Sequence, residues 1–213
     1  MVLYYILLPL AWLVFHIGFR VECVGRENLK KVQTGGCILA PNHVSAIDPV
    51  FVVITRFWGK RMVVFAKKEL FEINALLTWF FRCMGALCVR GTRDELETID
   101  KTVEVCKNGG TLLIFPEGTV IRNGIGKADG LPAHAHSGAA VIGVRTGAAL
   151  VPVFLDGEKK LFHRTRIIIG QPYTPVYPGR RGTAEEMQTI ADDLLREAYA
   201  LGGQQVGGAP LCK

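Results

Sequence analysis

PNHVSAIDP, residues 41–49, places one imidazole and one carboxylate five positions apart, where a predicted strand gives way to a predicted helix. Residues 38–40 are apolar and typical of a buried strand, and Asp48 followed by Pro49 is typical of a helix start. His43 is then expected in the loop between them, where a neutral imidazole can accept a proton and a nearby aspartate can stabilise the imidazolium. Spacing alone leaves a second interpretation open, in which Asp48 only caps the helix and His43 only fills the loop.

Short apolar runs alternate with amphipathic stretches along the rest of the chain. This alternation predicts an α/β fold with a largely parallel sheet flanked by helices. In such a sheet, the loops that follow the strands carry the functional residues. The last helix is expected to begin with a capping box from Thr183 to Glu186. The predicted strands are residues 37–40, 62–66, 86–89, 111–115, 150–155 and 166–169, and the predicted helices are residues 49–57, 75–84, 94–107, 137–146 and 184–201.

The first nineteen residues contain no Asp, Glu, Lys or Arg. As a helix rising about 1.5 Å per residue, they would nearly match the roughly 30 Å apolar thickness of a bilayer. Pro9 in the middle and His16 near the end argue against a straight transmembrane helix, and the features of a signal peptide are absent. We therefore expect an N-terminal membrane anchor helix over residues 1–19 that is tilted or half-inserted. The alternative is an apolar helix that is buried within the domain.

Positive charge follows this segment directly, at Arg20, Arg26, Lys30 and Lys31. The positive-inside tendency and the attraction of cations to anionic headgroups predict a protein at the cell membrane, with the following domain facing the cytoplasm. That domain is expected to span residues 20–201. The tail, residues 202–213, is rich in glycine and is predicted to be disordered.

Composition and charge limit the classes of partner. With 213 residues, of which 49% are hydrophobic, the chain can bury one substantial core. The net charge of +6 predicts a negatively charged partner, which could be an anionic membrane surface, a phosphorylated substrate or a nucleic acid. No nucleic acid is expected as a partner, because the basic residues form no aromatic-interleaved stripe and no nucleic-acid motif is present. The six cysteines lack the spacing of a zinc site, so no metal is expected.

A second apolar segment surrounds residues 74–84. Its large side chains, Leu76, Trp79, Phe80 and Phe81 among them, leave a helix apolar almost all round. Such a helix is either fully buried or faces lipid. Beside an anchor helix, it is consistent with a hydrophobic groove that receives an acyl chain, while plain core packing is an equal alternative.

FPEGT, residues 115–119, follows a predicted strand and forms a sharp polar turn. Glycine lets the backbone approach a ligand closely, and turn amides together with a hydroxyl can bind an anion or a polyol. Arg90 directly follows the predicted strand 86–89, and Arg122 lies just beyond the turn. The forked guanidinium of arginine is suited to phosphate. Taken alone, FPEGT could equally be an ordinary turn.

Four motifs in this order, NHVSAID, LCVRG, FPEGT and VPV, resemble those of the glycerolipid acyltransferase family. The resemblance spans roughly residues 21–170 and is greatest to the bacterial 1-acyl-sn-glycerol-3-phosphate (lysophosphatidic acid) acyltransferases. Enzymes of this kind transfer a fatty acyl group from acyl-CoA or acyl carrier protein to the free sn-2 hydroxyl of 1-acylglycerol-3-phosphate at the membrane surface, which gives phosphatidic acid. The resemblance implies a lysophospholipid and an acyl thioester as co-substrates, acyl carrier protein as one candidate partner, and no cofactor.

Carried over by position, the resemblance implies that His43 is the general base and Asp48 its orienting partner. It implies that Glu117, Gly118 and Thr119 shape the glycerol-phosphate site. Direct transfer is the simplest mechanism, because the chain has no G-x-S-x-G elbow that would present a serine nucleophile.

The resemblance also implies roles for three cations. Arg90 would hold the phosphate, and Lys67, in the stretch AKKEL, would add positive charge near the phosphate or the thioester. A plain surface position for Lys67 is an equal alternative. Many members have an arginine directly after FPEGT, whereas here two residues intervene before Arg122. Arg122 is therefore the candidate to supply the charge of that arginine.

A further departure is the segment AHSG, residues 135–138, which stands where the family usually has phenylalanine and lysine before a glycine. His134 and His136 are further candidates for contacts with the phosphate, or else exposed loop residues. These departures leave His43 untouched but leave the acceptor headgroup open. The alternatives are an acyltransferase for another lysolipid, an acyl-thioester hydrolase and a non-catalytic lipid-binding protein.

Overall fold

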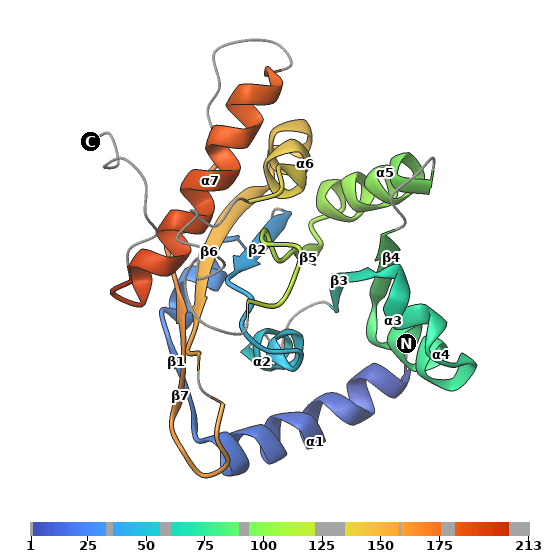
Figure 1. The fold of residues 1–213 in the computed structure, drawn as a ribbon, viewed down its shortest axis with the longest axis vertical. Coiled ribbons are helices and arrows are strands. Elements are labelled where there is room, and N and C mark those ends of the chain that lie inside the picture. Colours follow the sequence, from blue (N-terminus) through green and yellow to red (C-terminus); the bar gives the residue numbers. More distant parts are fainter. Residues whose placement is uncertain are drawn as a thin grey trace.

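The computed structural model describes residues 2–32, 36–55, 61–89, 94–121, 135–157, 159–175 and 182–204. Over these residues the chain forms a seven-stranded sheet with helices on both faces (Figure 1). The order of strands across the sheet is β1-β7-β6-β2-β5-β3-β4. The strands are β1 (Val21–Val24), β2 (Cys37–Pro41), β3 (Met62–Lys67), β4 (Ala86–Val89), β5 (Thr111–Leu113), β6 (Ala149–Leu155) and β7 (Thr165–Ile169).

The helices connect and cover these strands. A 3-10 helix, η1 (Arg26–Val32), follows β1. The α-helices are α1 (Val2–Phe19), α2 (Asp48–Thr55), α3 (Lys68–Glu72), α4 (Ala75–Met84), α5 (Asp94–Lys107), α6 (Gly138–Thr146) and α7 (Ala184–Leu201).

Every strand pair in the sheet is parallel except β6 with β7. β2 lies in the middle, where Leu39 stands opposite Leu113 of β5 on one side and Val151 of β6 on the other. All five residues of β2 are buried, as expected for a central strand covered on both faces. The predicted α/β fold with a largely parallel sheet is confirmed.

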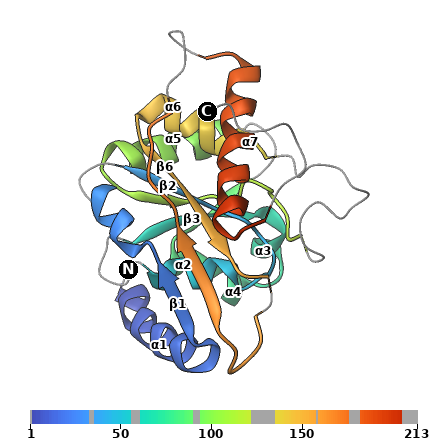
Figure 2. The ribbon, with the colours of Figure 1, turned by 90° about the vertical axis from the view of Figure 1, so that its left-hand side faces the viewer.

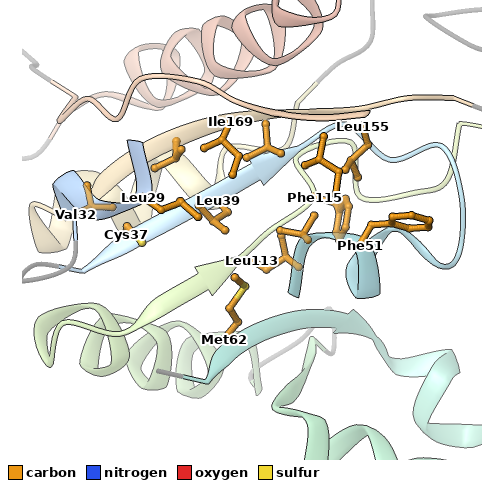
Figure 3. Close-up of a cluster of buried hydrophobic side chains, with 14 residues drawn as sticks. Leu29, Val32, Cys37, Leu39, Phe51, Met62, Leu113, Phe115, Leu155 and Ile169 are labelled. Atoms are coloured by element: carbon orange, nitrogen blue, oxygen red, sulfur yellow. The ribbon is translucent and has the colours of Figure 1, made fainter. Parts of the chain in front are cut away.

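Alternate residues of β2 point into two different cores. Cys37 and Leu39 join Phe51 of α2 and the side chains of η1 on one face of the sheet (Figure 3). Ile38 and Ala40 face the other side, where α5, α6 and α7 pack. The period-2 alternation of a strand therefore divides the apolar residues between two layers of helices.

The predicted elements agree with the structure over most of the sheet, but β1, η1 and α3 were not predicted. β1 was missed because a four-residue edge strand with alternating exposure carries little apolar signal, and its parallel partner β7 lies far along the sequence. α3 was missed because it is a single short turn of helix after β3. The capping box at the start of α7 is confirmed, with Thr183 and Glu186 each accepting the other's backbone N–H.

α1 has two apolar faces with different surroundings. Tyr4 and Leu8 are buried against Ile54 of α2, and Phe15 and Phe19 stack edge-on against Phe51. The outward face carries exposed apolar side chains, and α1 forms the edge of the molecule on the α2 side of the sheet (Figure 2). The exposed residues are Tyr5, Ile6, Leu10, Leu13, Val14 and Ile17. The alternative of a helix fully buried within the domain is therefore wrong for this face.

Among the described residues, no helix combines the length and the apolar character needed to cross a membrane. α4 is not fully buried either, because Leu76 and Trp79 are exposed. An acyl-chain groove beside α4 stays a prediction. The tail beyond residue 204 lies outside the described residues.

Candidate active site

Three loops meet at one edge of the sheet, because they follow three neighbouring parallel strands. β2, β5 and β6 lie side by side, with β2 in the middle, so their carboxyl ends deliver residues 42–48, residues 114–121, and residues 156, 157 and 159 to the same place. The side chain of Asn42 fastens the first loop to β6, since its amide donates to Leu155 O (3.1 Å) and its carbonyl accepts from Leu155 N (2.7 Å). The predicted site therefore sits at the point where ligands bind in open α/β sheets.

His43 and Asp48 form the central pair of the site. Nδ1 of His43 lies 3.0 Å from Oδ2 of Asp48. An ionised carboxylate only accepts hydrogen bonds, so Nδ1 carries the proton and Nε2 is left as the basic nitrogen. The imidazole stacks on Phe115, with ring centroids 4.1 Å apart, and 15% of its side chain remains exposed. The ring is thus held on one side and open to a substrate on another.

Asp48 is fully buried, and both its oxygens have partners. Oδ2 accepts the backbone N–H groups of Val44 and Ser45, each at 2.7 Å, in addition to His43. Oδ1 lies 2.7 Å from Nζ of Lys159, which is also buried. Burial alone would raise the pKa of Asp48, but the hydrogen bond from His43, the charge of Lys159 and the loop amides together hold it below its ordinary value.

These contacts bear on the two interpretations of residues 41–49. Asp48 does begin α2, but its carboxylate binds the preceding loop and the imidazole. The interpretation in which Asp48 only caps a helix is therefore wrong. Val44 and Ser45 act through backbone N–H groups, so their side chains carried no signal for this role.

Glu117 is a second buried carboxylate, and it holds the backbone of His43. Its Oε2 accepts the N–H of His43 at 2.6 Å, and its Oε1 accepts the hydroxyl of Tyr199 from α7. Burial raises the pKa of Glu117, and the hydrogen bonds from Tyr199 and His43 only partly oppose this. Glu117 therefore holds the loop that carries His43 against α7, and none of its described contacts points toward a headgroup site.

The FPEGT turn depends on glycine at position 118. Gly118 has a φ of +63°, and its N–H donates to Phe115 O at 3.0 Å. A Cβ at this position would lie 2.6 Å from the ring of His136, whose backbone N–H donates to Pro116 O. A side chain at residue 118 would therefore be strained and would also displace His136. His136 is exposed beside the turn, whereas His134 lies outside the described residues.

The turn is also joined directly to the His43 loop. The N–H of Ile121 donates to the carbonyl of His43 at 2.7 Å. Thr119, two residues before Ile121, is exposed and so is accessible to a ligand. The hydrogen bonds of Glu117 and Ile121 hold the peptide groups on both sides of the His43 Cα.

The predicted cations are only partly described. Lys67 ends β3 opposite Val89 of β4, so its backbone lies at the same edge of the sheet, beyond β5. Nothing is described of its side chain, and Arg90 and Arg122 lie outside the described residues. Their contacts with phosphate stay predictions.

Sequence reasoning missed two residues that contact the site. Lys159 follows the central strand β6, and a charged residue at the end of such a strand is a signal that could have been used. Tyr199 lies on the apolar face of α7, where a buried hydroxyl needs a hydrogen-bond partner. The identity of that partner, Glu117, depends on the tertiary packing and has no local signal.

Over the same described residues, no group of three or more His, Cys, Asp or Glu side chains is arranged to hold a metal ion. Burial raises the pKa of the Cys23 thiol to about 11 and that of the Cys106 thiol to about 12. The described part of the site therefore offers an imidazole, two carboxylates, a buried ammonium group, a hydroxyl and backbone amides.

The chain is similar to proteins of known family. Residues 20–156 match the family model described as Acyltransferase. The chain is 26% identical over 145 residues to the chloroplastic 1-acyl-sn-glycerol-3-phosphate acyltransferase LPAT1 of Arabidopsis thaliana, which covers 67% of this chain and 38% of that protein. It is 28% identical over 150 residues to the 1-acyl-sn-glycerol-3-phosphate acyltransferase of Borreliella burgdorferi, covering 68% of this chain and 54% of that protein. The chain thus spans about half or less of the length of these two relatives.

Two further similarities extend over more of the chain. A probable 1-acyl-sn-glycerol-3-phosphate acyltransferase of Mycoplasma pneumoniae is 24% identical over 199 residues, covering 84% of this chain and 70% of that protein. The crystal structure of the 1-acyl-sn-glycerophosphate (LPA) acyltransferase PlsC from Thermotoga maritima superposes with a TM-score of 0.58 at 22% identity, covering 86% of this chain and 71% of that one. The likeness in structure shows a shared fold. The family match includes both His43 and Glu117, and it shows that this chain belongs to the Acyltransferase family.

Proposed function

We propose that the protein transfers a fatty acyl group from an acyl thioester, either acyl-CoA or acyl carrier protein, to the sn-2 hydroxyl of 1-acylglycerol-3-phosphate, which gives phosphatidic acid. The observation that carries this proposal is the His43–Asp48 pair at the carboxyl edge of a sheet of the Acyltransferase family. The names of the curated relatives support the choice of acceptor.

The chemistry follows from the tautomer of His43. Nε2 takes the proton of the lipid hydroxyl as its oxygen attacks the thioester carbonyl carbon, and Asp48 stabilises the imidazolium that forms. The tetrahedral intermediate then collapses, the C–S bond breaks, and the imidazolium returns the proton to the leaving thiolate. An ester and a free thiol result, and no covalent intermediate with the protein is needed. A positioned imidazole contributes about 10²- to 10⁴-fold in rate.

The headgroup would bind on the β5, β3 and β4 side of His43. Thr119 offers an exposed hydroxyl there, and Gly118 lets the ligand approach the backbone. Lys67 ends β3 along the same edge, and Arg90 follows β4 directly in the sequence. Cations at these positions, together with Arg122, would suit a phosphate monoester.

Membrane association at the cell membrane, with the catalytic domain facing the cytoplasm, is part of the proposal. The outward face of α1 supports it, because that face is apolar while the inward face is already packed. Leu161 and Phe162 are exposed beside the end of α1, where the N–H of Phe162 donates to Gly18 O. Arg20, Arg26, Lys30 and Lys31 follow α1 and would favour anionic lipids. An apolar helix face lying in the interface would bring the site close to its lipid substrate.

An acceptor panel tests the substrate. Purified protein on mixed vesicles is supplied with long-chain acyl-CoA or acyl carrier protein, and separately with lysophosphatidate, lysophosphatidylglycerol or lysophosphatidylcholine. The fastest product is expected to be phosphatidate. Faster acylation of another lysolipid would contradict the proposed acceptor, and fatty acid release that does not depend on any lysolipid would identify a thioester hydrolase.

The membrane proposal is tested on the exposed face of α1. The triple variant Ile6→Ser, Leu10→Ser and Ile17→Ser changes side chains that are 57% to 62% exposed, so the thermal unfolding temperature should stay close to that of the parent protein. Sedimentation with anionic vesicles is expected to fall. Undiminished sedimentation would exclude α1 as the membrane contact and would favour the exposed Leu76 and Trp79 of α4.

A further inference from the structure

Lys159 is a buried cation directly behind the catalytic pair. Its side chain is 3% exposed, and its Nζ lies 2.7 Å from Oδ1 of Asp48. A lysine in so closed a site requires a partner for its charge, since an unpaired buried ammonium group is strongly unfavourable.

The ammonium group is held from several directions. Besides Asp48, it donates to the backbone carbonyl of Asp156 at 2.7 Å, and it lies 5.7 Å from the centre of the Phe51 ring. Asp156 is itself anchored, because its carboxylate accepts from the backbone and the guanidinium of Arg166 on β7. The position of Nζ is therefore fixed by the end of β6 and by α2, independently of any substrate.

The two oxygens of Asp48 have separate partners. Lys159 occupies Oδ1, while Oδ2 receives His43 and two loop amides. With one oxygen bound to a fixed cation, the carboxylate plane cannot rotate, and Oδ2 stays directed at Nδ1 of His43. The same cation keeps the carboxylate ionised, so that it acts only as an acceptor.

We propose that Lys159 is a positioning residue of this active site, which fixes the orientation and the charge of the Asp48 carboxylate and thereby sets the tautomer and the basicity of His43. This inference rests on the proposed His43–Asp48 mechanism. Lys159 acts through Asp48 and does not touch substrate, because its side chain is almost completely buried.

The charged and titratable groups around Asp48 determine how the pH profile should respond. His43 and Lys159 contact the carboxylate directly, Glu117 lies beyond the His43 backbone, and Tyr199 of α7 binds Glu117. Removal of the ammonium charge favours protonation of the imidazole and of Asp48 alike. Both effects inactivate the base, so both move the acid limb of the pH profile to higher pH.

The test uses Lys159→Met, which keeps an unbranched stem beside Phe51 and removes the charge. The kcat for acyl transfer should fall on the order of 10- to 100-fold, by analogy with the outer-shell groups that orient the ligands of a metal site. The KM values for donor and lysolipid should change less than about twofold, and the acid limb of kcat against pH should move upward. Lys159→Arg restores the charge and should recover part of kcat with the original acid limb. Lys160→Met, at the exposed neighbouring position, is the matched control and should match the parent protein.

A second comparison introduces Lys159→Met into the Asp48→Asn variant. It distinguishes an effect of Lys159 through Asp48 from a general disturbance of the fold, and it can replace the first test if Lys159→Met alone fails to fold. The double variant removes both buried charges, so it should be at least as stable to heat as Asp48→Asn. If Lys159 acts only through Asp48, the double variant should have the same residual activity as Asp48→Asn. A further loss of tenfold or more would overturn the inference, as would an unchanged kcat and acid limb in Lys159→Met.

His43→Ala is measured in parallel to separate this inference from the proposed function. An active His43→Ala would contradict the proposed mechanism itself. An inactive His43→Ala, together with a Lys159→Met that behaves like the parent protein, would contradict only the role of Lys159.

Discussion

Asp48 and Glu117 are both buried carboxylates that contact His43, yet their surroundings differ. Asp48 binds the ring and faces the ammonium group of Lys159, whereas Glu117 binds the backbone N–H and the neutral hydroxyl of Tyr199. The pKa of Asp48 is lowered as a result, and burial raises that of Glu117. Two carboxylates that contact one histidine are therefore suited to different tasks. In the proposed mechanism Asp48 stabilises a positive charge on the ring, whereas Glu117 holds the loop that carries the ring.

Among the changes to the two carboxylates and their partners, the largest expected effect is that of Asp48→Asn. The amide cannot stabilise an imidazolium, and acyl transfer should fall by up to about 10⁴-fold, the loss seen when the aspartate of a catalytic triad is so replaced. Loss of the partner of Lys159 should also lower the free energy of unfolding by about 3 to 5 kcal/mol. Steady-state rates and denaturant unfolding measure the two effects. Activity within tenfold of the parent protein would remove the distinction between the two carboxylates.

Glu117→Gln should have a much smaller effect, of about tenfold or less in rate, because a glutamine can replace both hydrogen bonds. Its carbonyl can accept from His43 N, and its amide can donate to the hydroxyl oxygen of Tyr199. The same transfer assay measures it. A loss as large as that of Asp48→Asn would show that the charge of Glu117 is needed, and would contradict a purely structural role.

Tyr199→Phe should be milder in activity, since Glu117 keeps its bond to the N–H of His43. The substitution leaves Oε1 of a buried carboxylate without this donor, which should lower the free energy of unfolding by about 1 to 3 kcal/mol. A few-fold loss of kcat is expected. Unfolding in denaturant, compared with Glu117→Gln, measures the effect, and an unchanged stability would show that the Tyr199 bond is dispensable.

The two carboxylates should also give opposite dependences of stability on pH. Because the pKa of Asp48 is lowered from 3.8, its contribution is complete above that pH and is lost as the pH falls through the folded-state pKa. Because the pKa of Glu117 is raised from 4.5, stability is lost as the pH rises from 4.5 through the folded-state pKa. Relative to Glu117→Gln, the parent protein should therefore lose stability as the pH rises above about 4.5. If the difference in the free energy of unfolding between the parent protein and Glu117→Gln did not change with pH, the raised pKa of Glu117 would be contradicted.

The contact of Asp48 with His43 was predictable from the sequence, whereas the contacts of Glu117 were not, and the reason is physical. His43 and Asp48 lie within one loop and one helix start, so their spacing in the chain already limits their distance. The partners of Glu117, Tyr199 and the His43 backbone, come from distant elements that meet only when β5, β2 and α7 pack together. Lys159 was missed for the same reason, because its contact depends on β6 lying beside β2.

The fold also has features that depend on local sequence and features that depend on tertiary packing. Strand and helix alternation predicted the elements and the parallel sheet, because each element has its own apolar period. The strand order was not predictable, since it depends on which buried faces fit together. β1 illustrates this, because its strand partner among the described residues is β7, far along the sequence.

The central claim is that His43 is the general base of an acyl transfer, with Asp48 as its charged partner. The most direct test is the rate of phosphatidate formation from lysophosphatidate and a long-chain acyl thioester by His43→Ala, with His163→Ala as a matched control at an exposed histidine. The account predicts a loss of about 10²- to 10⁴-fold for His43→Ala in a variant that still unfolds cooperatively, and parent activity for His163→Ala. A folded His43→Ala variant that forms phosphatidate at the parent rate would contradict it.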